Sequence, residues 1–266
     1  MNLKPLLLIT AFFFFITFQL NAQTKTVKPD NTDSKSAKKS THQLNFIKTN
    51  LTGIVFKNYS LQYERVLTRK FSFAIAFRTM PSTTIPFKNK IISLIGTNDS
   101  ITKQTIEKLR LSNIAITPEF RLYLSKKGFG KGFYIAPFYR YAKFKTNDLV
   151  FTYEDNLNVK STINLSGDLT SNTGGLLFGV QKFLGKHICL DFWLFGPHYG
   201  SGVGKFSGVS SKPLTQQEQD DLRQQLEGLD IPLTNKTVTV TANGASLKLD
   251  GPWAGIRSGF SIGVKF

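Results

Sequence analysis

The 266-residue sequence has few of the residues that build disulfides and metal sites. It contains one cysteine, Cys189, so no disulfide can form within the chain, and its three histidines, His42, His187 and His198, are far apart in the sequence. Protein sites for transition metals are usually built from several Cys and His side chains. We therefore expect no metal site. The lack of disulfides does not assign a compartment, because exported bacterial proteins are often made without them.

Acidic residues are also scarce. The chain has 17 Asp and Glu against 34 Lys and Arg, a formal net charge of +17. Such a charge can indicate nucleic-acid binding, but the basic residues are spread along the chain, and we expect anionic lipid surfaces rather than nucleic acid as the partner. The glycine-rich stretch 200–208, "GSGVGKFSG", lacks the spacing of a phosphate-binding loop. We interpret it as the start of a flexible loop.

Only one long apolar run is present, and it lies at the N-terminus. "PLLLITAFFFFITF" (5–18) follows Lys4, and Ala22 precedes a cleavage point at Gln23. This pattern predicts a signal peptide over 1–22. The alternative is a retained membrane anchor, although the run is shorter than the roughly 20 apolar residues of a spanning helix. The Lys-rich, polar segment 23–42 is typical of a disordered tether.

From about residue 43 onward, apolar residues recur at every second position, which predicts strands. The eight predicted strands are 46–56, 59–67, 70–80, 113–125, 133–144, 174–183, 187–196 and 255–266. Strands that span a membrane need about 9–11 residues, whereas strands of soluble proteins average about 5–6. The lengths therefore favour an all-β, eight-stranded antiparallel barrel over 43–266.

The connections between these strands alternate between short and long. Three are long, 81–112, 145–173 and 197–254, and the others are short; only the short link Lys57-Asn58 breaks the alternation. Outer-membrane barrels have short periplasmic turns and long extracellular loops. The pattern predicts an up-and-down transmembrane β-barrel with long extracellular loops, and an even strand count places both termini in the periplasm.

The long connections carry local patterns of their own. Asn243-Gly244 lies between two alternating segments in 237–249, a signal for a hairpin with a type I′ turn. The acidic segment 214–229 and the segment 100–110, which starts with Ser100 as a possible N-cap, predict helices. Residues 149–153 and 157–165 are expected to extend the neighbouring strands as a hairpin.

Alternation alone does not say which face of the barrel points inward, and a soluble lipocalin-like barrel has its apolar face inside. Aromatic residues at strand ends favour lipid on the outside, as in an interfacial girdle; they are Phe71, Phe133, Phe183 and Phe266. The opposite face carries charges of both signs at mid-strand: Glu64, Arg78, Glu119, Arg121, Arg140, Asp191 and Arg257. Because the interior of an eight-stranded barrel is just wide enough to be filled by side chains, we expect these charges to pair there and plug it.

The C-terminal stretch "GFSIGVKF", with the signal peptide, resembles the closing strand of Gram-negative outer-membrane barrels. The chain from about 43 resembles small eight-stranded barrels of the OmpA/OmpX type. More narrowly, "KNYSLQYERVL" (57–67), "ITPEFRLYL" (116–124), "GFYIAPFYRY" (132–141) and "LDFWLFGPHYG" (190–200) are similar to a family of such barrels of unassigned function. The resemblance implies that the barrel-assembly machinery recognises Phe260, Ile262, Val264 and Phe266.

Some barrels of this size are enzymes, and lipid A deacylases of this architecture use a His-x-Ser arrangement on a strand. Here His198 and Ser201 are three residues apart, which sends them to opposite faces of a strand. The carboxylates of Glu64, Glu119 and Asp191 are interpreted as members of salt bridges rather than as an acid–base set. We therefore expect no catalytic residue and no cofactor.

These observations favour a non-enzymatic outer-membrane scaffold whose loops serve binding or envelope integrity. The expected partners are outer-membrane lipids and lipopolysaccharide, the assembly machinery and an extracellular ligand of the loops. Two alternatives stay open: a narrow anion-preferring pore, and a lipid-modifying outer-membrane enzyme.

Overall fold

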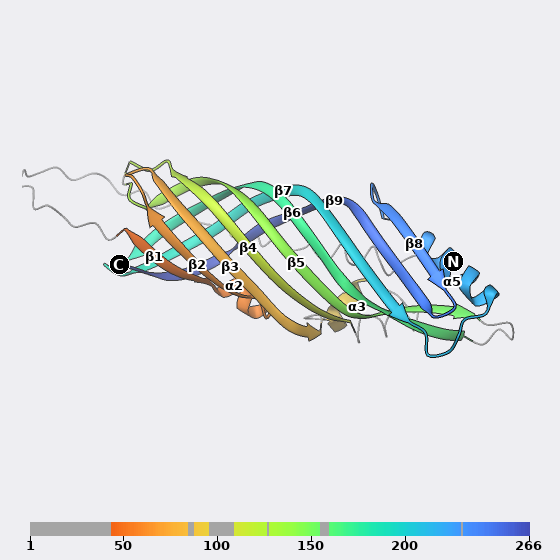
Figure 1. The fold of residues 1–266 in the computed structure, drawn as a ribbon. Helices are drawn as coiled ribbons and strands as arrows, with labels where there is room; N and C mark the ends of the chain where they lie inside the picture. The colour runs from red at the N-terminus through yellow and green to blue at the C-terminus, as the bar shows by residue number, and fades with distance from the viewer. Residues whose placement is uncertain (1–43, 85–87, 96–108, 127, 155–159, 230) are drawn as a thin grey trace, which may run out of the picture.

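The computed structural model describes residues 44–84, 88–95, 109–126, 128–154, 160–229 and 231–266 (Figure 1). These residues form nine strands and three helices. The strands are β1 (Asn45–Asn50), β2 (Tyr59–Val66), β3 (Phe71–Thr84), β4 (Arg110–Tyr123), β5 (Gly132–Glu154), β6 (Lys160–Leu184), β7 (Ile188–Val209), β8 (Asn235–Thr241) and β9 (Gly244–Lys265). The helices are α2 (Leu51–Val55), α3 (Lys88–Ile95) and α5 (Gln216–Glu227). The predicted signal peptide and tether lie outside the described residues, as does nearly all of the predicted helix 100–110.

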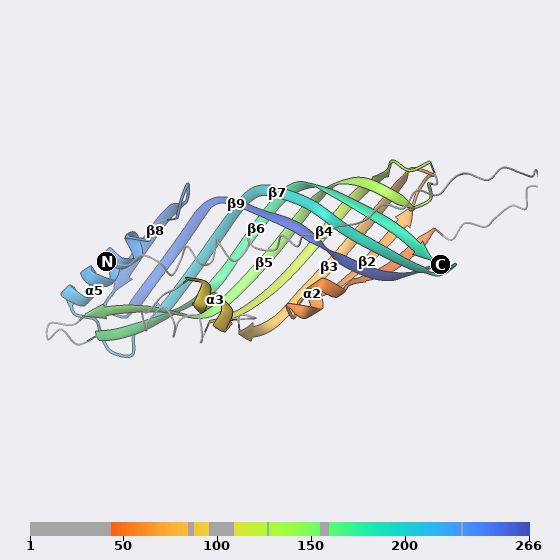
Figure 2. The same ribbon diagram turned by 180° about the vertical axis from the view of Figure 1, so that it is seen from behind.

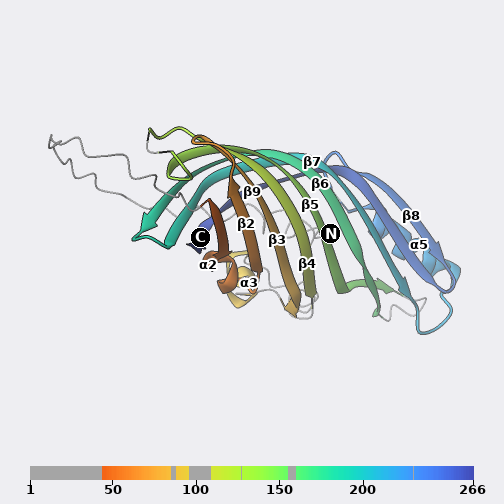
Figure 3. The ribbon, with the colours of Figure 1, turned by 60° about the vertical axis from the view of Figure 1, so that its left-hand side comes forward.

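All strands belong to one antiparallel sheet, in which β2 to β7 follow one another side by side in chain order (Figure 3). The sheet order is β1-β2-β3-β4-β5-β6-β7-β9-β8, and β1 also pairs with β9. Eight strands therefore close into a hydrogen-bonded ring, and β8 lies outside the ring on the edge of β9. The all-β, antiparallel class and the ring of eight strands that the sequence pattern predicts are confirmed.

Four strands extend far beyond the eight short segments predicted from alternation; for β5 and β6 this confirms the predicted hairpin extension, with pairs from Leu149–Leu165 to Glu154–Lys160, whereas the length of β7 and β9 was not predicted. β5, β6, β7 and β9 have 23, 25, 22 and 22 residues. The predicted loops 145–173 and 197–254 therefore consist largely of sheet, and the prediction of a flexible loop at 200–208 is wrong. Gly200 pairs with Thr173 on one side and Trp253 on the other, and a Cβ atom there would lie 2.0 Å from the Asn172 carbonyl oxygen. The glycine allows two backbones to approach closely; it does not loosen the chain.

The first predicted strand, 46–56, is only half correct. β1 ends at Asn50, and the apolar residues that follow form the five-residue helix α2. The Asn50 side chain accepts a hydrogen bond from the Gly53 amide (2.7 Å) and caps this helix. α2 lies beside β9, where the Thr52 hydroxyl oxygen accepts from the Phe260 amide (3.1 Å).

The long strands project beyond the ring and carry a second core. β8 and α5 lie together at that end of the molecule (Figure 2). The predicted hairpin at Asn243-Gly244 and the predicted helix within 214–229 are both confirmed by the β8–β9 pairing and by α5. Apolar side chains from α5 and the strands pack together here: Leu109, Leu149, Ile163, Leu165, Leu214, Leu222, Leu226, Leu229, Val240, Ala245 and Leu247.

The two faces of the ring have opposite chemistry. Large apolar side chains point away from the ring and stay exposed, among them Leu61, Tyr63, Phe71, Phe73, Ile75, Phe77, Ile114, Ile116, Phe120, Phe133, Tyr139, Leu194, Ile256, Val264 and Phe266. Polar and charged side chains on the alternate positions are buried inside. Phe183 is an exception to the predicted aromatic girdle, because it points inward and stacks on Phe46 with ring centroids 5.7 Å apart. Among the described helices, none is long and apolar enough to cross a membrane.

Candidate functional site

A network of ion pairs fills the ring between β1, β2, β4 and β7. The Lys48 ammonium binds the carboxylates of Glu64 and Asp191, the latter at 2.9 Å. The Arg121 guanidinium binds the same two carboxylates through Nη1, at 3.1 Å from Glu64 Oε2 and 2.7 Å from Asp191 Oδ2. All four side chains are fully buried. Two cations and two anions thus form a closed square across the interior.

A second arm of the network runs toward β9. Arg121 donates through Nε to Glu119 Oε1 (2.7 Å), and Gln62 donates to the same oxygen (2.7 Å). The other carboxylate oxygen of Glu119 lies 3.1 Å from Arg257 Nη1. Glu119 therefore links the central arginine to an arginine on the opposite wall of the ring.

Hydroxyl groups complete the hydrogen bonding of the buried carboxylates. Tyr123 donates to Glu64 Oε1 (2.6 Å), Ser72 donates to the same atom (2.5 Å), and Tyr134 donates to Asp191 Oδ1 (2.7 Å). The Arg121 guanidinium also stacks over the Tyr134 ring at 4.4 Å from its centroid. Buried charges are tolerated only when they are paired and hydrogen-bonded, and this network meets both requirements.

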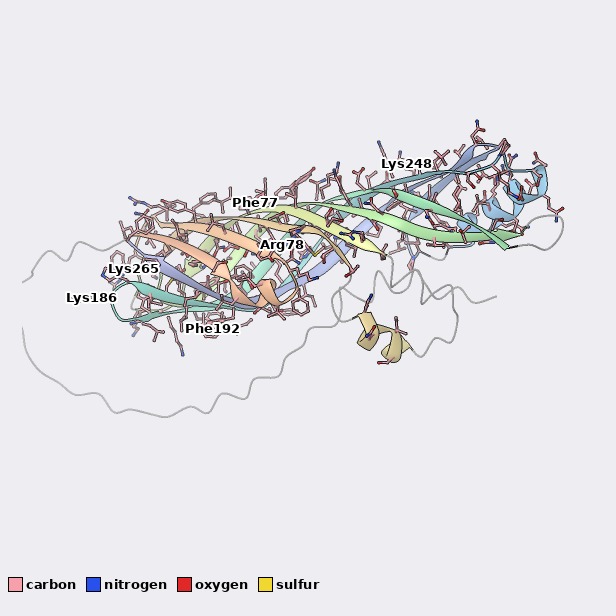
Figure 4. All side chains as sticks on the ribbon, turned by 90° about the horizontal axis from the view of Figure 1, so that it is seen from below. Phe77, Arg78, Lys186, Phe192, Lys248 and Lys265 are labelled. Carbon is pink, nitrogen blue, oxygen red and sulfur yellow. The ribbon has the colours of Figure 1, made fainter. Side chains whose placement is uncertain are left out.

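The structure brings together most of the charged residues singled out from the sequence. Glu64, Glu119, Arg121, Asp191 and Arg257 join one connected network. Arg78 and Arg140 also face the interior but bind no carboxylate among the described residues; Arg78 instead donates twice to the Asn113 side-chain oxygen (3.1 and 2.7 Å). Figure 4 labels Arg78 beside its outward-facing neighbour Phe77, which is 46% exposed.

Sequence reasoning missed Lys48, which binds two carboxylates and the Gln181 side chain. The signal lay in β1, where Phe46, Lys48 and Asn50 are buried and alternate with Ile47 and Thr49. The inward face of β1 is itself mixed, with one aromatic and two polar residues, so the alternation is hard to recognise. A lysine at an inward position opposite Gln62 was the available clue.

His198 and Ser201 do not form a catalytic pair. His198 lies within β7, partly buried against the Phe138 ring (centroids 5.9 Å apart), whereas Ser201 is exposed on the other face of the strand. Both residues lie within the strand, because β7 continues to Val209. In the described part of the chain, no group of three or more His, Cys, Asp or Glu side chains is arranged to hold a metal ion.

The proposed assembly residues lie at the seam where the ring closes. Ile262 and Val264 pair with Thr49 and Ile47 of β1. Phe260 packs on Phe192 with ring centroids 4.7 Å apart, and both Val264 and Phe266 are about half exposed. Figure 4 shows Lys186, from the β6–β7 turn, and Lys265 at this same end of the molecule.

Comparison of the chain with protein-family models, with curated proteins and with solved structures gives no match in any of the three.

Proposed function

We propose that this protein is a non-enzymatic outer-membrane β-barrel of the small eight-stranded OmpA/OmpX type. Its wall acts as a membrane scaffold, and its projecting strands present an extracellular surface for binding or for envelope integrity. Both termini lie in the periplasm, the outer surface of the ring contacts outer-membrane lipids and lipopolysaccharide, and the chain engages no nucleic acid.

The observation that carries this proposal is the inverted polarity of the ring. Apolar side chains such as Phe73, Ile75 and Leu61 face outward and are 41%, 42% and 59% exposed, while Glu64 and Arg121 inside are 0% exposed. A soluble protein rarely leaves so large an apolar surface in water. A hydrocarbon environment removes that conflict, and a closed ring satisfies the backbone hydrogen bonds that lipid cannot.

The projecting end supports a surface-presentation role. It has its own apolar core under α5, and the capping box of Thr215 and Glu218 fixes the start of that helix. Because this end is ordered by packing, it presents a defined surface rather than loose loops. We propose that the partner of the protein binds here.

The closing strand supports assembly by the barrel-assembly machinery. Asn45 and Phe266 exchange two backbone hydrogen bonds, of 2.9 and 3.0 Å, so the residue that follows β9 and the first residue of β1 complete the ring together. We propose that Phe260, Ile262, Val264 and Phe266 guide the chain into the membrane before this seam forms.

The buried network favours a plugged scaffold over the alternative of an anion-preferring pore. Lys48, Arg121 and the carboxylates that they bind cross the interior and leave no free charged group among them for an ion to follow. A lipid-modifying activity has no supporting constellation in the described residues, since His198 and Ser201 face apart.

The proposal is tested by fractionating cells that express the full chain and by running the purified product on gels with and without heating. We expect the protein in the outer membrane, with a faster-migrating form that heat converts to the slower one. Planar-bilayer recordings should show no steady conductance. A soluble product would contradict the membrane assignment, and a steady anion-selective current would contradict the plugged scaffold.

A further inference from the structure

Three arginines from three different strands face the interior of the ring. They lie at the end of the ionic network that is nearer to the projecting strands. Arg78 comes from β3, Arg140 from β5 and Arg257 from β9. Arg257 binds Glu119 and lies over the rings of Phe138 and Trp193, at 4.4 and 4.9 Å from their centroids. Phe138 is two residues from Arg140 on the same face of β5, so Arg257 reaches across the ring to the strand that carries Arg140.

Arg140 has no counter-charge among the described residues. The residue is buried, with 7% of its surface exposed, and in the described part of the chain its guanidinium makes no hydrogen bond or ion pair. The charged groups that act on it are Arg78 and Arg257, both of which repel it. Arg78 has only the neutral amide of Asn113 as a partner. Two buried or partly buried cations therefore remain uncompensated.

Such an arrangement is unfavourable unless an anion completes it. A charge removed from water is stabilised in a protein interior only by an opposite charge and by hydrogen bonds. The carboxylates of the ionic network are already shared by Lys48, Arg121 and Arg257. Lys48, Arg78, Arg121, Arg140 and Arg257 thus face three carboxylates in this part of the described interior, and the two arginines without one are Arg78 and Arg140.

Several inward positions around Arg78 and Arg140 carry short side chains: Ala76, Ala115, Ala142 and Thr173. The larger inward neighbours are Asn113, beside Arg78, and Phe138, on the same face as Arg140. Two further polar atoms nearby are buried without a hydrogen-bond partner in the described structure, Nδ1 of His198 and Nε1 of Trp193. The charges of all three arginines act on His198. Both rings lie close to Arg257: its guanidinium is 4.9 Å from the centroid of the Trp193 ring, and His198 packs against Phe138, over which Arg257 also lies.

Over part of its length, β9 has no neighbouring strand on the side of β1 in the described structure. β9 pairs with β1 only from Ser261 onward and with β8 only up to Asp250. Between these points, the edge of β9 that faces β1 has no strand partner among the described residues, and Pro252 adds a residue without an amide donor. Arg257 lies within this stretch.

We propose that Arg78, Arg140 and Arg257 form an interior binding site for an oxyanion of the phosphate class, either free phosphate or a phosphate group carried by a lipid. Guanidinium groups bind phosphate through paired, charge-assisted hydrogen bonds, and Arg140 supplies a group that no carboxylate of the described residues satisfies. This inference goes beyond the scaffold function and stands on the interior geometry.

The test uses the full mature chain, folded in a non-ionic detergent without phosphate. Isothermal titration calorimetry measures binding of inorganic phosphate in one arm and of dihexanoyl phosphatidic acid in the other, with dihexanoyl glycerol as the phosphate-free control. We expect phosphate and phosphatidic acid to bind and the glyceride not to bind. Tighter binding of the phosphatidic acid assigns a lipid source, and equal affinities assign a free anion.

Two variants separate the site from general surface charge. Arg140→Gln should weaken binding by about tenfold or more, because a charge-assisted hydrogen bond contributes roughly 1.5–3 kcal/mol. Arg223→Gln, at a partly exposed arginine of α5 that pairs with Asp220, should bind as the parent does. Without phosphate, Arg140→Gln should be at least as stable as the parent, since it removes an uncompensated charge; a purely structural role would make it less stable.

Three results would overturn the proposal: no binding of either phosphate compound above the glyceride, unchanged binding by Arg140→Gln, or equal weakening by Arg223→Gln. If Arg140→Gln shows no heat-modifiable folded form, Arg78→Gln takes its place with the same expectation. The phosphate arm does not depend on the membrane assignment, so its failure is distinguishable from failure of the proposed function.

Discussion

Arg121 and Asp191 are 70 positions apart in the chain, yet Arg121 Nη1 lies 2.7 Å from Asp191 Oδ2. This ion pair joins β4 to β7 across the inside of the ring, and Lys48 from β1 binds the same carboxylate oxygen at 2.9 Å. Strands that are not neighbours in the sheet are thereby fixed relative to one another. The network therefore stabilises the cross-section of the ring as well as filling it.

Replacing Asp191 by Asn should strongly destabilise the fold. The substitution keeps the shape of the side chain but leaves two buried cations with fewer anions, and removing one partner of a buried pair costs about 3–5 kcal/mol. Urea-induced unfolding in detergent, followed by tryptophan fluorescence, measures the free energy of unfolding. Asp168→Asn is the matched control. Asp168 pairs with Lys143 at 3.0 Å, but both side chains are about 40% exposed. Removing this ion pair should therefore lower the free energy of unfolding by less than about 1 kcal/mol. Similar effects of the two substitutions would contradict this account of the network.

Much of the wall could be predicted from sequence because a half-buried strand repeats every two residues. Phe71, Phe73, Ile75 and Phe77 face outward in β3 as the alternation predicts. The face with charges of both signs was predicted to point inward, because oppositely charged side chains can pair there. The apolar face was therefore predicted to point outward. Glu119 and Arg121 are two residues apart on β4, and that spacing already placed them on one face.

What the sequence could not reveal depended on contacts between distant segments. Leu51–Val55 is apolar enough for a strand, but the Asn50 cap and the contact of Thr52 with Phe260 turn it into helix. Lys48 gains its role only from the carboxylates of β2 and β7. The glycines of 200–208 led to the prediction of a loop. Only the close packing of β7 between β6 and β9 shows why small residues are needed there.

A charged side chain introduced on the outer surface of the ring tests whether that surface contacts lipid or water. Ile75→Arg places a cation on the outer surface of β3, where the parent side chain is 42% exposed. Near the middle of a bilayer, such a substitution in a barrel costs about 2–4 kcal/mol, whereas an exposed position in water changes stability by about 0.5 kcal/mol or less. In lipid vesicles, we expect Ile75→Arg to lower the free energy of unfolding, measured with urea, by the larger of these two amounts.

The control for Ile75→Arg is Val209→Arg. Val209 is 84% exposed and ends β7 at the projecting end of the molecule, so we expect no measurable change there. If Ile75→Arg is as harmless as Val209→Arg in vesicles, the outer face of β3 is not in contact with hydrocarbon.

Gly200 should tolerate no side chain. A Cβ atom there would lie 2.0 Å from the Asn172 carbonyl oxygen, whereas a Cβ at Gly174 would meet its nearest neighbour, the Phe138 carbonyl oxygen, only at 4.0 Å. Gly200→Ala should therefore push β7 away from β6 and lower stability by about 1–3 kcal/mol, as overpacking does. Gly174→Ala should change it little. Amide hydrogen exchange of β6 and β7 measures both effects, and equal protection in the two variants would contradict the close approach.

The start of α5 should lose stability in acid because of Glu218. Its carboxylate accepts a hydrogen bond from the Thr215 amide (2.7 Å), and this bond, helped by Lys212 at 3.1 Å, lowers the pKa of Glu218 below its ordinary value of 4.5. A carboxyl group with a lowered pKa in the folded state contributes stability above its unfolded pKa, and that contribution is lost as the pH falls through the folded pKa. Exchange of α5 amides, corrected for the intrinsic effect of pH on exchange, should therefore become faster below about pH 4.5.

Two variants separate the charge of Glu218 from the rest of the cap. Glu218→Gln should lower the protection of α5 at neutral pH and remove its dependence on acid, because the amide does not titrate in this range. Thr215→Ala removes the hydroxyl that accepts from the Glu218 amide (3.4 Å) and should lower helix stability by about 1 kcal/mol at every pH. It keeps the backbone donor of Thr215, so the acid dependence should persist. If the acid dependence survives in Glu218→Gln, another group is responsible for it.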